Sequence, residues 1–145
     1  MKKEHYIKLE NMMHLAPFVQ LTGLKANITE GEAEIILPVE RKLFHGANAM
    51  HGALYFLTLD NAAFFAVNSL VEDYYVLTAT FDIKLTKPVS SGIVKAFGKV
   101  TKQVKSIYSA ESSLYNSDDE IIAVGNGKFI KSKIKLSPEL GYTLL

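Results

Sequence analysis

The spacing of hydrophobic and polar residues changes several times along the chain, and each change predicts a new element. Residues 52–70 are apolar on nearly every helical face, which is typical of a helix enclosed by protein. Residues 77–85 alternate with a period of two, which places Leu77 and Phe81 on one predicted face and Thr78 on the other. The pattern therefore predicts a long buried helix followed by a strand.

The remaining segments predict further strands and one short helix. A short amphipathic helix is expected at residues 11–16, with Asn11 as its cap and Pro17 as its end. Gly31 marks a tight turn between two strands, and residues 40–50 lack periodicity and are expected to form a loop. The expected strands are residues 19–28, 32–39, 77–85, 93–100, 104–115 and 121–131.

One enclosed helix among so many strands predicts an α+β fold. Parallel strands need a crossover helix between each pair, and only one long helix is predicted, so the sheet is expected to be mostly antiparallel. The simplest arrangement is a curved sheet of five to six strands wrapped around the helix, with residues 1–145 in a single domain because no repeat or linker interrupts them. The exposed sheet face or edge predicts association with another copy of the chain.

Composition narrows the function classes. With 48% hydrophobic and 21% charged residues, the chain has the balance of a globular domain. Its net charge of +1 disfavours a nucleic-acid or membrane partner, and the absence of cysteine excludes disulfide scaffolds and thiolate chemistry. The N-terminus lacks the apolar stretch of an export signal, and the apolar helix carries Asp60 and Asn61, so a cytoplasmic protein without a membrane span is expected.

The most unusual residue is Asp60, in the middle of the apolar helix. An unpaired carboxylate in a dry interior costs several kcal/mol or more, so Asp60 is either a structural acid with hydrogen-bonding neighbours or a functional base or nucleophile. At the helix start, the backbone N–H groups of Gly52 and Ala53 could hold a developing oxyanion. Gly52 and Asp60 are roughly 12 Å apart at 1.5 Å per residue. This separation predicts a site shared by two antiparallel helices.

Three stretches resemble one known family. HGANAMHGALYFLTLDNAAFFAV, APFVQLTGLK before the first strands and LTATFDIKLTKPV after the helix are similar to hotdog-fold acyl-CoA thioesterases of the phenylacetate-pathway and 4-hydroxybenzoyl-CoA thioesterase superfamily. Members carry His-Gly-Gly at the helix start and an Asp nine residues after the His. His51, Gly52 and Asp60 keep this register, with Ala53 in place of the second glycine. The resemblance covers nearly the whole chain and implies the hotdog fold.

The resemblance also implies an activity and its catalytic residues. It implies an enzyme that hydrolyses an acyl thioester to free acid and coenzyme A at a dimer interface. Gly52 N–H would polarise the thioester oxygen, while Asp60 of the partner chain would activate water or attack directly. Thr78 matches a position that assists the water, and His45 stands where relatives carry an asparagine that orients the carbonyl or water.

Three further residues are expected at the substrate. Asn48 is an alternative to His45 for the orienting role, and Ala53 adds a methyl group that would narrow access to the thioester. His51 is expected to hold the loop through a side-chain hydrogen bond at the helix start. The expected partners are an acyl-CoA or acyl-carrier-protein substrate and further copies of the chain, in a homodimer or homotetramer.

Other chemistries are weaker. A metal site of His45, His51 and Asp60 lacks a recognised ligand spacing, so no metal is expected, and coenzyme A would enter only as part of the substrate, without a separate cofactor. One alternative is a non-catalytic acyl-CoA or lipid-binding hotdog protein, which the changes at His45 and Ala53 would favour. Another is a hotdog dehydratase or hydratase, which would need a histidine and an acid poised at C2 and C3 of the acyl chain.

Overall fold

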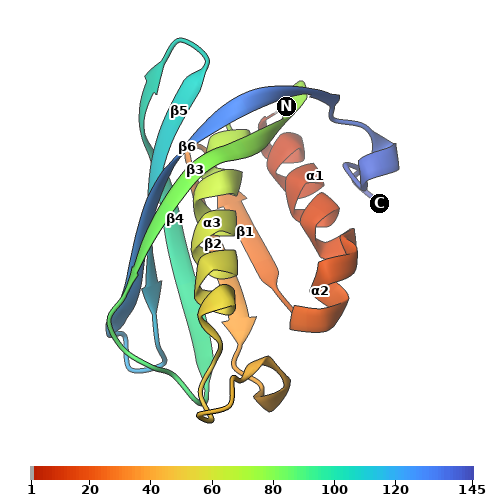
Figure 1. Cartoon of the computed structure of the whole chain (residues 1–145). Helices are drawn as coiled ribbons and strands as arrows, with labels where there is room; N and C mark the ends of the chain where they lie inside the picture. The colour runs from red at the N-terminus through yellow and green to blue at the C-terminus, as the bar shows by residue number, and fades with distance from the viewer. Residues whose placement is uncertain (1) are drawn as a thin grey trace.

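A six-stranded antiparallel sheet curves around one long helix in the computed structural model, which describes residues 2–145 (Figure 1). The strand order is β1-β2-β4-β5-β6-β3, so β1 and β3 are the two edges. The predicted α+β architecture is confirmed. The helices are α1 (Lys2–Leu15), α2 (Pro17–Thr22) and α3 (Gly52–Asn68), and the strands are β1 (Lys25–Thr29), β2 (Glu32–Pro38), β3 (Tyr74–Leu85), β4 (Ile93–Val104), β5 (Ile107–Tyr115) and β6 (Ile121–Lys135).

Small residues let α3 lie close against the concave face of the sheet. Gly98 on β4 lies beneath the helix, where an added Cβ would come within 2.4 Å of the Ala62 carbonyl oxygen. The Ser112 hydroxyl of β5 donates a 2.8 Å hydrogen bond to the Leu59 carbonyl oxygen. These contacts fix the depth and rotation of the helix, and therefore the direction in which its polar side chains point.

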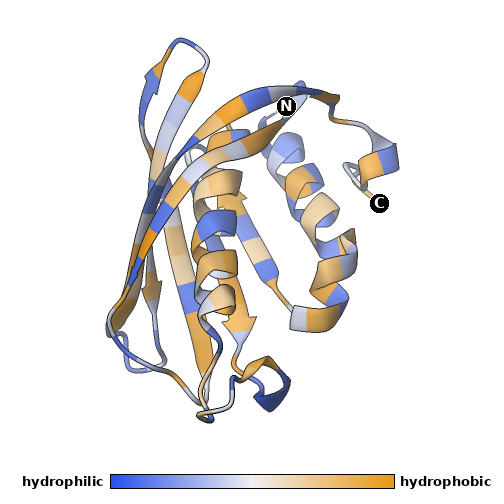
Figure 2. Ribbon diagram, viewed as in Figure 1, coloured by the Kyte–Doolittle hydropathy of each residue, from blue (hydrophilic) through white to orange (hydrophobic). Residues whose placement is uncertain are grey.

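The structure corrects the prediction that α3 is enclosed along its whole length. Residues 62–68 are buried, but Phe56 in the first half of the helix is 40% exposed. Figure 2 shows that hydrophobic residues continue along α3 into this open half, which lies beside the edge strand β3. None of the helices among residues 2–145 is sufficiently long and apolar to cross a membrane.

The N-terminal region also differs from the prediction. A helix was expected only at residues 11–16, but α1 occupies Lys2–Leu15, because His5, Leu9 and Met12 form a buried stripe at helical spacing among charged residues. Asn11 is therefore not a helix cap, and its side-chain amide donates instead to the Thr143 carbonyl oxygen at 2.7 Å.

The strand predicted at residues 19–28 is shorter than expected. Pro17 starts a second helix, α2, because proline suits the first helical turn, and Gly23 ends it with φ of 75°. The strand β1 begins only at Lys25. The chain consequently forms a helical corner at residues 15–23, where the sequence predicted extended backbone from residue 19.

A β-bulge in the edge strand β3 changes which residues face the helix. Thr78 pairs with Phe129 and Thr80 with Lys128, so Ala79 is an extra residue on β3. Thr78 and Phe81 consequently both face α3, whereas the sequence pattern placed them on opposite faces. Leu77, predicted to share the face of Phe81, is 42% exposed.

The C-terminal segment returns to cover α1 (Figure 1). The ring of His5 lies 2.6 Å from the Tyr142 hydroxyl through Nδ1 and 2.8 Å from the Asn68 carbonyl oxygen through Nε2. Burial lowers the pKa of His5, which keeps the ring neutral. Nε2–H then donates to Asn68 and Nδ1 accepts from Tyr142, so one histidine ties the C-terminal segment to the end of α3.

Candidate functional site

Asp60 points from the middle of α3 toward Thr78 on the edge strand. The Thr78 hydroxyl donates a 2.9 Å hydrogen bond to Asp60 Oδ1, and among residues 2–145 it is the only side-chain donor to this carboxylate. Partial burial raises the pKa of Asp60, and the Thr78 hydrogen bond opposes that rise. Within the described part of the chain, the carboxylate therefore has one neutral hydrogen-bond partner and no ion-pair partner, an arrangement that suits a base better than a structural ion pair.

A hollow of about 410 Å³ gives access to this carboxylate. We call it the Asp60 hollow. Its walls come from α2, α3 and β3, so the bulge that turns Thr78 inward also shapes its floor. The lining residues are Phe18, Leu57, Asp60, Asn61, Phe64, Tyr75, Leu77 and Thr78.

The start of α3 is capped by His51. Its Nδ1 accepts a 2.9 Å hydrogen bond from Ala53 N–H, which is the local hydrogen bond expected of this histidine. The expectation that both Gly52 and Ala53 offer free N–H groups is therefore wrong for Ala53. Gly52 N–H has no hydrogen-bond acceptor among residues 2–145. It remains available to an oxygen atom at the positive end of the helix dipole.

His45 and Gly52 border a second hollow of about 310 Å³, the Gly52 hollow. His45 Nδ1 accepts from Ala47 N–H at 3.0 Å, which leaves its other ring nitrogen for a ligand. Asn48 has φ of 64° and an exposed side chain in the loop turn, and it borders neither hollow. The other lining residues of the Gly52 hollow are Met50, Tyr55, Leu85, Thr86, Lys87 and Pro88.

The predicted site residues thus form two separate groups within one chain. Asp60 and Thr78 border one hollow, His45 and Gly52 border the other, and the two hollows share no lining residue. The eight residue steps along the helix from Gly52 to Asp60 hold the groups roughly 12 Å apart. A single substrate carbonyl cannot contact both groups in one copy of the chain.

The comparison with protein families matches residues 47–123 to the thioesterase superfamily, which is more than half of the chain. The chain belongs to the thioesterase superfamily. The matched segment contains Gly52, all of α3 and the edge strand β3 with its bulge, whereas His45 lies just before it. The comparison with curated protein sequences gives no match.

This chain has the hotdog fold, as its similarity to solved structures of other proteins shows. PaaI from the phenylacetic acid degradation operon of E. coli is 20% identical, with a TM-score of 0.81 over 92% of this chain and 99% of that chain. A thioesterase family protein from Silicibacter pomeroyi is 23% identical, with a TM-score of 0.78 over 85% and 94%. Protein PA5202 from Pseudomonas aeruginosa is 24% identical, with a TM-score of 0.76 over 81% and 95%.

Tyr75 is a further residue at this site. It borders the Asp60 hollow and contacts Phe64 of α3 with 5.2 Å between ring centroids. Burial and the nearby charge of Asp60 raise the pKa of Tyr75, so its hydroxyl stays protonated as a hydrogen-bond donor. A register irregularity between Tyr74 and Val76 turns the ring inward. Simple alternation along β3 does not reveal such a shift.

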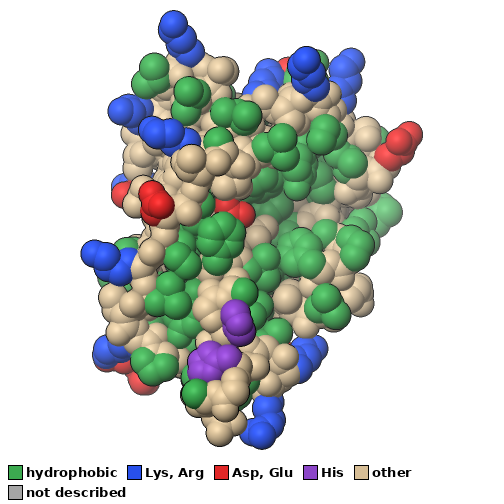
Figure 3. Space-filling view, viewed as in Figure 1, with side chains coloured by type: hydrophobic (Ala, Val, Ile, Leu, Met, Phe, Trp, Pro, Cys, Tyr) green, Lys and Arg blue, Asp and Glu red, His purple; other side chains and the backbone are tan. Residues whose placement is uncertain are grey.

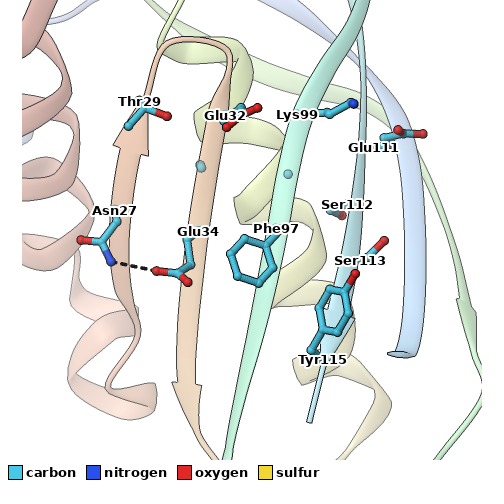
Figure 4. A pocket seen from close by; sticks show the side chains of 12 residues that line it. Asn27, Thr29, Glu32, Glu34, Phe97, Lys99, Glu111, Ser112, Ser113 and Tyr115 are labelled. Atoms are coloured by element: carbon cyan, nitrogen blue, oxygen red, sulfur yellow. Dashed lines mark hydrogen bonds between the residues drawn. The ribbon is translucent and has the colours of Figure 1, made fainter. Parts of the chain in front are cut away.

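A hollow on the outer face of the sheet lies apart from this site. A hollow of about 440 Å³ lies on the outer face of the sheet, where Asn27 donates to Glu34 and Phe97 stands exposed, with α3 behind the strands (Figure 4). It holds no residue of either group. Among residues 2–145, no three His, Cys, Asp or Glu side chains are grouped as metal ligands would be.

Proposed function

We propose that this protein hydrolyses acyl-CoA thioesters at a site shared by two copies of the chain. The observation that carries the proposal is the division of the site. Asp60, whose pKa is raised, borders the Asp60 hollow in the middle of α3. Gly52, whose N–H is free, borders the Gly52 hollow at the start of the same helix. Each group supplies what the other lacks, because ester-type hydrolysis needs a base and an oxyanion donor at one carbonyl.

The edge strand β3 offers a way to combine the groups. An edge strand has unpaired backbone groups along one side, and β3 also leaves Leu77 and Leu85 more than 40% exposed. Antiparallel pairing of two copies through β3 would set their α3 helices antiparallel. Asp60 of one copy would then lie near Gly52 of the other, giving two equivalent sites per dimer.

The reaction follows from these positions. Asp60 takes a proton from water as the water oxygen attacks the thioester carbonyl, and Thr78 holds the carboxylate in place. The carbonyl oxygen becomes an oxyanion that accepts from Gly52 N–H of the other copy. Collapse breaks the carbon–sulfur bond, and the departing thiolate of coenzyme A takes up the proton. Direct attack by Asp60, followed by hydrolysis of the resulting anhydride, gives the same products.

This reaction needs only the protein's own groups and water. A raised pKa brings the basicity of Asp60 closer to neutral pH, where a general base is most effective. His45 would lie beside the oxyanion donor and could donate a further hydrogen bond to the substrate from its free ring nitrogen. No metal or separate cofactor is required in this scheme.

Free-thiol release from a panel of acyl-CoAs tests the activity. We expect Asp60→Asn to lower kcat by about 100-fold or more, the scale of a positioned base. The matched control is Asp118→Asn, because Asp118 lies exposed in the turn between β5 and β6, outside both hollows and away from β3, and should leave kcat unchanged. Equal activity of Asp60→Asn and wild type would refute the assignment. Acyl-CoA binding without any release would favour a non-catalytic binding protein.

Complementation tests the shared site. Asp60→Asn and Gly52→Pro chains are each expected to be inactive, but a mixed dimer would hold one intact site. Random pairing makes half of the dimers mixed, so co-expression should restore about a quarter of wild-type activity if the site is isologous and shared. Absence of any recovery in verified mixed dimers would place both groups of one site in a single copy.

A further inference from the structure

A further hollow, larger than the Asp60 and Gly52 hollows, adjoins the Asp60 hollow within the same chain. We call it the distal pocket. It has a volume of about 570 Å³ and shares Phe18, Asn61 and Tyr75 with the Asp60 hollow. Its remaining lining residues are Met12, Met13, Leu15, Ala16, Pro17, Phe65, Ile134, Pro138, Glu139, Leu140 and Gly141. In Figure 3, hydrophobic side chains gather in the depression between α3 and the helices α1 and α2.

The lining of the distal pocket is suited to an apolar guest. Asn61 is the polar residue nearest the junction, and its amide already donates to the Leu57 carbonyl oxygen at 2.8 Å. Glu139 lies exposed at the outer rim. Met12 and Met13 supply flexible thioether side chains that adapt to an unbranched chain. Apart from the Tyr75 hydroxyl and Asn61 at the junction and Glu139 at the rim, the lining of the distal pocket is apolar.

The far wall of the distal pocket is held by specific contacts of the C-terminal segment. Tyr142 is bonded to His5, and Thr143 accepts from Asn11, so this wall is fixed to α1. Gly141 packs so closely that an added Cβ would lie 3.3 Å from Leu15. Defined elements thus line the pocket, and its volume lies within the usual range of ligand sites.

We propose that the distal pocket binds the linear aliphatic chain of a fatty acyl thioester whose carbonyl lies at Asp60, an inference that rests on the proposed function. Asn61 and Tyr75 line both hollows, so a chain that passes from the carboxylate into the distal pocket would run along these two side chains. Along α3, Asn61 and Phe65 lie one turn apart and lead the chain away from Asp60 toward α1. Substrate selection then depends on chain length and on the flexible methionines.

Binding of non-hydrolysable thioethers tests the pocket without relying on turnover. Each buried methylene should tighten binding about fourfold until the pocket is filled. We expect S-dodecyl-CoA to bind wild-type protein at least about 100-fold more tightly than S-butyl-CoA, as measured by calorimetry. Asp60→Asn should keep this difference, since it removes the base and leaves the pocket intact.

Two variants block the pocket from opposite walls. Ala16→Phe fills it from the start of α2, and Leu140→Trp fills it from the C-terminal segment. Either change should reduce the difference between the dodecyl and butyl analogues to less than about tenfold while S-butyl-CoA binding stays the same. Gln20→Phe is the matched control, because Gln20 is exposed on α2 and outside the pocket. Thermal melting identifies any variant that does not fold.

The outcomes separate the pocket from the proposed function. The proposal is overturned if wild type shows no gain with chain length, if folded blocking variants keep the gain, or if S-(2-phenylethyl)-CoA binds as tightly as the dodecyl analogue. A gain that Ala16→Phe abolishes, in a protein without thiol release, would support the pocket and refute hydrolysis. Thiol release that depends on Asp60, without any gain in affinity with chain length, would support hydrolysis and refute the pocket.

Discussion

Replacing one backbone N–H tests the central geometric claim about Gly52. Proline suits the first position of a helix, and His51 already has the extended conformation, with φ of −62° and ψ of 141°, that a residue before proline requires. The Gly52 N–H has no acceptor among residues 2–145, so its removal breaks no hydrogen bond of the folded chain. An added Cβ would meet Leu85 at 3.5 Å, an ordinary contact.

The expected effect of Gly52→Pro follows from the loss of one oxyanion donor. Such a loss lowers kcat by about 100- to 1,000-fold, or about 2.7–4 kcal/mol of transition-state stabilisation. Gly52→Ala adds a methyl group but keeps the N–H, so we expect a loss of less than about tenfold. Thiol release under saturating acyl-CoA measures kcat for both. Equal losses in the two folded variants would show that bulk, not the N–H, matters at this position.

Three further predictions concern Asp60 and the packing of α3. Because burial raises the pKa of Asp60, the folded state binds this proton more tightly than the unfolded state, and stability from the group is lost as pH rises through the folded pKa. The melting temperature of Asp60→Asn minus that of wild type should therefore increase as pH is raised from 4 to 7. A difference that does not change with pH would contradict this linkage. Thr78→Val removes the hydrogen bond that lowers this pKa, so the acidic limb of kcat/KM should move to higher pH, whereas Thr78→Ser should keep the wild-type profile. Gly98→Ala places a methyl group against Ala62 and should cost about 1–3 kcal/mol in urea unfolding, while Gly46→Ala, with open space around it, should cost less than about 0.5 kcal/mol.

Much of the fold was predictable because local periodicity reports burial directly. The apolar run of α3, the alternation of the later strands and the turn at Gly31 all place side chains by their spacing alone. The separation of Gly52 from Asp60 was also predictable, since the rise of a helix is fixed. The part of α1 before residue 11 was not predicted, because charged residues there outnumber the buried ones and only packing against β1 reveals the buried stripe.

The sequence by itself determined which groups are present and how far apart the helix holds them. It identified Asp60 as an acid in an apolar helix and Gly52 as the residue at the helix start, because both statements depend only on spacing along the chain. The tertiary structure decided which of these groups are free and what they face. The His51 side chain accepts the hydrogen bond of Ala53 N–H, and the bulge at Ala79 turns Thr78 toward Asp60. Hydrogen-bond pairing and strand register depend on partners distant in sequence, so no local pattern specifies them.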